Sequence, residues 1–207
     1  MPIVGARGDP PPATAVAMAV EALCGGDIVG MPTDTVYGLA ADPFHTGAAD
    51  RLFRLKGRPR RVELPVLVAN EEQALSLCTA VPPEGRRLME RYWPGPLTLV
   101  LPRRPDLDAD LGEEDATIGI RCPAHPLPLA VCAEMGPIAT TSANRHGEPA
   151  ITTAQGVAQA FGPEIALVLD GGTCDQLPSS VVDCTGGAPK VLREGRISVV
   201  EILAALA

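Results

Sequence analysis

The chain has 207 residues, 46% of them hydrophobic and 20% charged, which is long enough to bury a sizeable core in one domain. Its formal net charge is -8 and its aromatic content is 3%, a balance that disfavours a protein whose main role is nucleic-acid binding. No stretch reaches the roughly 18 apolar residues of a membrane helix, and the N-terminus lacks a secretory signal pattern. We therefore expect a cytoplasmic protein without membrane contact.

The six cysteines are scattered, without a CxxC pair or a close Cys/His grouping. This spacing predicts reduced, partly buried thiols and no metal site. The three histidines, His45, His125 and His146, are isolated from one another, so no acid–base pair stands out. The common phosphate-binding signatures GxxxxGK[ST] and GxGxxG are absent from the sequence, so any nucleotide must be bound by another arrangement.

Helical and strand patterns alternate along the chain with short connections, which favours an α/β fold. We expect a flexible lead-in over residues 1–12 and one globular domain over 13–207, with a twisted mixed sheet flanked by helices and a central ligand cleft. The predicted helices cover 13–23, 48–55 (capped by Thr46), 71–77, 84–92, 127–134, a segment ending at 161, and 198–207. The predicted strands cover 28–31, 64–69, 97–101, 117–121, 137–141, 166–169, 178–183 and 191–193.

A hydroxyl-rich turn over 33–39 follows the first predicted strand. Its threonines and its glycine can present O–H and N–H groups to a ligand that approaches the backbone closely. The alternative is a polar turn in which the threonine side chains cap the local backbone. The residues alone leave both interpretations open.

Six cations fall between residues 51 and 61, in a chain that is otherwise acidic. Lys56, Arg58 and Arg60 alternate along an expected extended loop, so their side chains point to one side. Guanidinium and ammonium groups that converge in this way favour phosphate. The sequence thus predicts an exposed phosphate-binding loop, with a solvated run of charges as the alternative.

Other polar residues lie at or just after predicted strand ends, where α/β sheets bind their ligands. The groups around Thr35, Lys56, Arg121, Ser142 and Arg193 are therefore expected to surround one cleft. Lysine, arginine, serine, threonine and asparagine dominate these groups. Such side chains orient anions and stabilise developing charge, which suits phosphoryl or nucleotidyl transfer.

Seven motifs occur in order: PTDTVYGLA at 32–40, KGRP at 56–59, PGPLTLVL at 94–101, IRCPAHP at 120–126, TTSANRHGEP at 140–149, SSVVD at 179–183 and LREGRI at 192–197. With these motifs the chain resembles the YrdC-type L-threonylcarbamoyladenylate synthases, in their short, single-domain form. The resemblance implies a YrdC-like fold and a nucleotidyltransferase reaction in which L-threonine, bicarbonate and ATP give threonylcarbamoyl-AMP and pyrophosphate. It also implies that downstream transferase proteins modify adenosine 37 of tRNA. Mg²⁺ is expected to enter with ATP, because magnesium often has few protein ligands besides the substrate phosphates. Weak tRNA binding is a further expectation.

The resemblance also assigns roles to residues. The family's KxR motif corresponds to Lys56 and Arg58, and its SxN motif to Ser142 and Asn144; these four are the expected catalytic residues. The expected ATP contacts are Lys56, Arg58, Thr117, Ser142, Asn144 and Arg193, and the expected threonine contacts are Thr35, Arg121, Thr140 and Ser179. Because Lys56 and Arg58 are expected on an exposed loop, losing either should cost catalysis more than folding.

Two departures from the family pattern affect this transfer of roles. Glu63 stands where relatives often have proline, which puts an acid beside the basic loop, and Leu67 stands where many carry histidine. The alternatives to a synthase are an RNA-binding module of the same fold, a related carbamoyl-transfer enzyme and a non-catalytic regulator. Salt-sensitive RNA binding without catalysis would identify the first of these.

Overall fold

The computed structural model describes residues 1–113, 116–145, 147–174 and 177–207. Its strands are β1 (Ile3–Gly5), β2 (Val29–Met31), β3 (Gly38–Ala41), β4 (Val66–Leu67), β5 (Leu97–Pro102), β6 (Thr117–Arg121), β7 (Ile138–Ser142), β8 (Leu167–Asp170), β9 (Ser180–Asp183) and β10 (Lys190–Arg193). Its helices are α1 (Ala13–Cys24), α2 (Ala48–Lys56), α3 (Glu71–Leu77), α4 (Pro83–Tyr92), α5 (Pro126–Met135), α6 (Ala154–Phe161), the 3₁₀ turn η1 (Gly162–Glu164) and α7 (Val199–Leu206).

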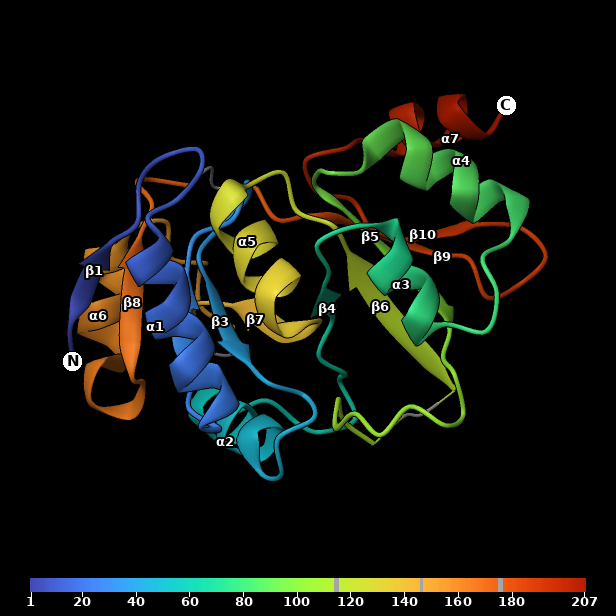
Figure 1. Ribbon diagram of the computed structural model, residues 1–207. Helices are drawn as coiled ribbons and strands as arrows, with labels where there is room; N and C mark the ends of the chain where they lie inside the picture. The colour runs from blue at the N-terminus through green and yellow to red at the C-terminus, as the bar shows by residue number, and fades with distance from the viewer. Residues whose placement is uncertain (114–115, 146, 175–176) are drawn as a thin grey trace.

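The ten strands of the described residues form one sheet, in the order β1-β8-β2-β3-β7-β4-β6-β5-β9-β10. The sheet is mixed, because β2 pairs with β8 in parallel and with β3 in antiparallel orientation. Figure 1 shows helices packed against both halves of this twisted sheet. The predicted α/β fold with a mixed sheet is confirmed.

Residue alternation along the strands divides the apolar side chains between two cores, one on each face of the sheet. The first core receives side chains from α2, α3, α4, α6 and α7. The second core receives side chains from α1 and α5, which pack on β2, β3, β4, β7 and β8. Within the described residues, β5, β6 and β9 contribute nothing to the second core. That face of the sheet is therefore open beyond the edge of α5.

Several elements differ from the sequence-based expectation. Residues 3–5, which we expected in a flexible lead-in, form β1 and pair in parallel with β8 at the sheet edge. The strand expected over 64–69 is only two residues long, and β3 was not predicted. Gly47, in a left-handed conformation, occupies the N-cap of α2 where we expected Thr46 to cap.

Side-chain caps begin helices α6 and α7. Thr153 caps α6 by accepting a hydrogen bond from the Gly156 backbone N–H, and Ser198 forms a capping box with Glu201 at the start of α7. The six cysteines carry free thiols, five of them buried or half-buried. Helices long and apolar enough to cross a membrane are absent from the described part of the chain.

Candidate active site

The candidate site lies on the open face of the sheet, where the strand register brings alternate residues together. Gly38 of β3 is opposite Ser142 of β7, and the Thr140 backbone N–H donates to the Pro65 carbonyl (2.8 Å). Farther along the sheet, Leu67 of β4 is opposite Arg121 of β6. Because the side chains of paired residues share a face, these strands present their residues to one cavity.

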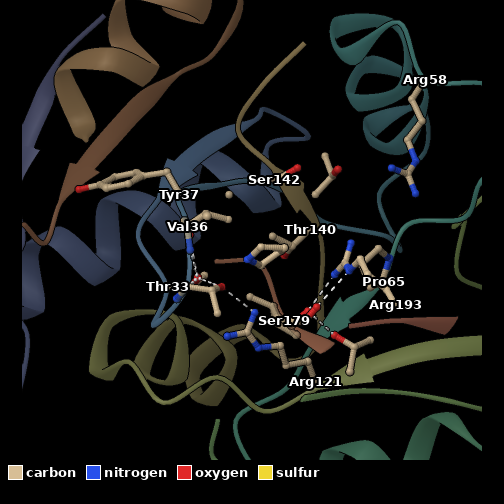
Figure 2. Close-up of a pocket in the computed structure, with 16 residues that line it drawn as sticks. Thr33, Val36, Tyr37, Arg58, Pro65, Arg121, Thr140, Ser142, Ser179 and Arg193 are labelled. Atoms are coloured by element: carbon tan, nitrogen blue, oxygen red, sulfur yellow. Dashed lines mark hydrogen bonds between the residues drawn. The ribbon is translucent and has the colours of Figure 1, made fainter. Parts of the chain in front are cut away.

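This inner cavity has a volume of about 140 Å³. Figure 2 shows its lining, to which arginine and hydroxyl side chains converge from separate strands and loops. The lining comprises Thr33, Thr35, Val36, Tyr37, Gly38, Arg58, Pro65, Leu67, Thr98, Arg121, Thr140, Thr141, Ser142, Pro178, Ser179 and Arg193. Residues predicted from six separate stretches of sequence thus meet in one place.

An outer cavity of about 210 Å³ adjoins the inner one. The two share Arg58, Pro65, Thr98, Ser179 and Arg193, and the outer cavity continues over Val100, Gly119 and Val181 on the same sheet face. Together they form an elongated cleft. The residues that line both cavities lie where the two cavities meet, which we call the junction.

Arg58 and Arg193 bring two guanidinium groups to this junction. Arg58 donates to the carbonyls of Val62 (2.7 Å) and Glu63 (2.6 Å), and Arg193 donates to the Ser179 carbonyl (3.0 Å) and hydroxyl (3.1 Å). Burial lowers the pKa of both arginines, and for Arg58 the charge of Arg193 lowers it further. Over the described residues, no carboxylate forms an ion pair with either. Two uncompensated positive charges at one point favour an anionic ligand.

Arg121 has a different environment from the one predicted for it. Its side chain is 7% exposed and forms an ion pair with Asp34 (2.5 Å), whose side chain is 12% exposed. The guanidinium also donates to the Thr35 hydroxyl (3.0 Å) and to the Gly95 carbonyl (3.0 Å). Arg121 therefore holds the 33–35 turn in place, and its charge is compensated by Asp34 before any substrate arrives.

The 33–35 turn combines the two interpretations that its sequence left open. The Thr33 hydroxyl donates to the Val36 carbonyl (2.7 Å) and accepts from the backbone N–H groups of Thr35 and Val36, so it caps the local backbone. The hydroxyls of Thr33 and Thr35 lie 2.9 Å apart, and both residues line the inner cavity. The turn is both self-capped and open to a ligand.

Lys56 is buried rather than exposed on a loop. It is the last residue of α2, is 4% exposed, and donates to the Ser142 carbonyl (2.5 Å), the Asn144 carbonyl and Asn144 Oδ1 (3.0 Å). All three ammonium protons are therefore committed to the 142–144 segment. The expected position of Lys56 on an exposed loop is wrong. Its loss should therefore cost folding stability as well as catalysis, because the Asn144 carbonyl loses its ammonium donor while the Ser142 carbonyl and Asn144 Oδ1 each lose one of two donors.

Asn144 is likewise committed within its own loop. Its Nδ2 group donates to the carbonyls of Arg145 (2.9 Å) and Glu148 (2.7 Å), and its Oδ1 accepts from Lys56 and from the Ser142 hydroxyl (2.5 Å). Asn144 does not line either cavity. Ser142 lines the inner one, and because its proton is given to Asn144, its hydroxyl can only accept from a ligand.

The other cations of the 51–61 run do not converge on the cleft. Arg60 is paired with Asp50 and Asp110 (2.5 Å to the latter), and Arg51 is paired with Asp27 (2.9 Å). The prediction that Arg60 points to the same side as Lys56 and Arg58 is wrong, because α2 continues to Lys56 and Gly57 turns the chain. The run supplies one side chain to the cleft, that of Arg58.

Thr117 lies outside both cavities. It shares the sheet face of Gly119 and Arg121 by strand alternation, at the far end of β6. The sequence did not single out Thr98 or Tyr37, which line the inner cavity. Thr98, buried in β5, lies 2.9 Å from the Ser179 hydroxyl, and strand alternation within PGPLTLVL could have indicated its face.

Metal ligands are not grouped in the described residues: three or more histidine, cysteine or carboxylate side chains do not come together there. Glu63 is the one acidic residue among the described residues that line the outer cavity. His125 caps α5 by accepting from the Leu127 N–H (3.2 Å), while His146 lies outside the described residues. This donor set does not build a metal cage, but it fits an ion coordinated chiefly by substrate phosphates.

The pKa of Lys56 predicts a pH dependence. Burial and the charge of Arg58 lower this pKa from 10.5 to about 8. A neutral amine has two N–H groups and cannot serve three acceptors, so we expect the catalytic rate at this site to fall as pH rises through about 8. In the same range the unfolded chain still binds this proton, so the contribution of Lys56 to folding stability rises with pH. The expected loss of activity is therefore not caused by unfolding.

The test measures the catalytic rate as a function of pH for the wild type and for Lys56→Arg. Circular dichroism at each pH checks that both proteins remain folded. A guanidinium keeps its proton throughout this range, so the variant should retain its activity above pH 8. An identical decline in both proteins would contradict the assignment of the titration to Lys56.

Comparison with known proteins places this geometry in a family. A family model named Sua5/YciO/YrdC, described as telomere recombination, matches residues 21–195. A chain of Mycobacterium leprae is 39% identical over 191 residues, covering 92% of this chain and 87% of that one. The threonylcarbamoyl-AMP synthase of Bacillus subtilis is 40% identical over 92% of this chain, which spans 56% of that relative.

Comparison with solved structures leads to the same family. P. abyssi Sua5 complexed with L-threonine aligns with a TM-score of 0.89 at 34% identity, over 99% of this chain and 61% of that one. E. coli YciO aligns with a TM-score of 0.86 at 24% identity, over 97% of each chain, which shows the fold. Because the family model spans most of the chain, the protein belongs to the Sua5/YciO/YrdC family.

Proposed function

We propose that this protein is a threonylcarbamoyl-AMP synthase, which forms threonylcarbamoyl-AMP and pyrophosphate from L-threonine, bicarbonate and ATP. The observation that carries the proposal is the pair of uncompensated guanidiniums, Arg58 and Arg193, at the junction of two adjoining cavities. The named relatives and the threonine-bound structure of P. abyssi Sua5 support the substrate class.

The two cavities suit the two larger substrates. The inner one, at about 140 Å³, is smaller than the roughly 300–1,000 Å³ of common ligand pockets, so it suits an amino acid. The nucleotide then lies over the outer cavity, with its phosphates between Arg58 and Arg193. This arrangement directs the α-phosphate toward the amino acid.

The reaction follows from these positions. The threonine amine combines with carbon dioxide from bicarbonate to give a carbamate, and a carbamate oxygen attacks the α-phosphorus as pyrophosphate leaves. Ser142, whose hydroxyl can only accept, suits an N–H or O–H of the amino acid. Arg58 and Arg193 stabilise the charge that develops on the phosphates.

Mg²⁺ is proposed to enter with ATP and to neutralise phosphate charge. The same proposal includes downstream transferase proteins that pass the threonylcarbamoyl group to adenosine 37 of tRNA, and a cytoplasmic location, which the free thiols support. RNA binding as the main role has less support, because Arg51 and Arg60 of the basic run are paired with carboxylates.

The test is pyrophosphate release from ATP by the purified protein, with threonine and bicarbonate each added and omitted. The proposal predicts release only when both are present. Release that does not depend on threonine would reject it. So would an inactive protein that binds RNA with strong salt dependence.

A further inference from the structure

The inner cavity has an apolar wall beside its polar one. Pro65 and Leu67, two residues apart in one extended segment, form this wall, while Val36 lines the cavity from the separate turn after β2 (Figure 2). Leu67 is 4% exposed and also belongs to the second core, which α5 covers. In the sheet it is paired with Ile138 on one side and Arg121 on the other. Its side chain therefore separates the cavity from the apolar interior.

The chemistry of this wall limits which part of a ligand can face it. An ammonium, carboxylate or hydroxyl group placed against Leu67 and Pro65 would lose its hydrogen bonds to water without replacement. A methyl group gains free energy by leaving water at the same place. In an amino acid such as threonine, the methyl on the β carbon is the group that fits.

Resting on the proposed function, we infer that Leu67 is a specificity-determining residue that selects the amino acid by contact with its β-methyl group. Serine lacks this methyl group and therefore makes no apolar contact with Leu67 and Pro65. A larger β substituent has no room, because the cavity measures about 140 Å³ and Leu67 closes it toward the second core.

The experiment measures binding of three amino acids by titration calorimetry: threonine, serine and 3-hydroxynorvaline, which carries an ethyl group in place of the methyl. The wild type should bind threonine about 10- to 200-fold more tightly than serine, the range for one methylene in an apolar pocket. It should bind 3-hydroxynorvaline more weakly than threonine. Leu67→Ala should narrow the preference for threonine over serine and bind 3-hydroxynorvaline more tightly than threonine.

Val66→Ala is the matched control. Val66 is the neighbouring residue of β4, is 1% exposed, and points into the first core on the opposite face. Its truncation costs packing in the same strand but leaves the wall intact, so the wild-type order of the three ligands should persist. A gained preference for the ethyl compound cannot result from a general loss of stability.

The inference is overturned if Leu67→Ala keeps the wild-type order, if Val66→Ala changes the order in the same way, or if the wild type binds none of the three ligands. A wild type that shows the expected order but forms no threonylcarbamoyl-AMP would remove the proposed reaction. It would leave the role of Leu67 in place. Binding and product formation thus report on the two proposals separately.

Discussion

Arg58→Ala is expected to lower kcat/KM for pyrophosphate release by about 10³-fold or more, since an arginine that stabilises phosphoryl-transfer charge contributes about 10³ to 10⁵. Arg58 lines both cavities, and no carboxylate of the described residues forms an ion pair with it. Its removal relieves repulsion with Arg193 and takes away two hydrogen bonds to loop carbonyls. Folding stability should therefore change little, by about 1 kcal/mol or less.

Arg61→Ala is the matched control for this variant. Arg61 lies in the same basic segment, is exposed, and lines neither cavity. Its loss should leave kcat/KM within about a factor of three, because exposed charges contribute little. Equal losses in both variants would mean that the whole basic segment, and not the guanidinium in the cleft, supports the reaction.

Arg121→Met is expected to destabilise the folded protein by about 3–5 kcal/mol, the cost of breaking a buried ion pair from one side. It leaves the Asp34 carboxylate buried without its cation, and the second oxygen of that carboxylate already has no hydrogen-bond partner among the described residues. The loss should appear as a lower midpoint in urea unfolding. The Thr35 hydroxyl also loses its donor, so threonine binding should weaken as well.

A second variant keeps this prediction specific. Combining Arg121→Met with Asp34→Asn removes the uncompensated charge and should recover more than half of the lost stability. Full stability in Arg121→Met alone, with threonine binding abolished, would contradict the structural role. It would restore the sequence-based assignment of Arg121 as a direct contact to threonine.

The sequence predicted the fold class because most strands are apolar runs bounded by glycine or proline. It missed β3 for a physical reason. Gly38, Leu39, Ala40 and Ala41 have weak strand propensity, and their conformation depends on pairing with β7. A Cβ atom at Gly38 would lie 2.8 Å from the Thr140 side chain, so the glycine is needed for close packing across strands. Such a requirement is visible only in three dimensions.

The sequence located the polar clusters of the cleft. It did not show which of their cations are bound by protein groups and which remain available to a ligand. Lys56 and Arg121 resemble ligand-binding cations in sequence, yet each is committed to protein partners, Lys56 to the 142–144 segment and Arg121 to Asp34. Both partnerships join residues about ninety positions apart. Local spacing carries no information about such pairs. The uncompensated charges belong instead to Arg58 and Arg193.

Thr98 shows the converse error. It lies in an apolar strand that resembles core, and although alternation separates its face from that of Leu97 and Leu99, the pairing of β5 with β6 and β9 decides that this face borders the cavity. The register of three strands decides whether such a residue faces the core or the cleft. The position of Leu67, between cavity and core, follows from the same register.

The most direct test of the account is to identify the product made from ¹³C-bicarbonate, L-threonine and ATP by mass spectrometry, with Arg58→Ala and Arg61→Ala beside the wild type. The account predicts an adenylate that carries threonine and one ¹³C atom, formed with pyrophosphate by the wild type and by Arg61→Ala but lost in Arg58→Ala. An unlabelled adenylate, or a labelled product that persists in Arg58→Ala, would contradict it.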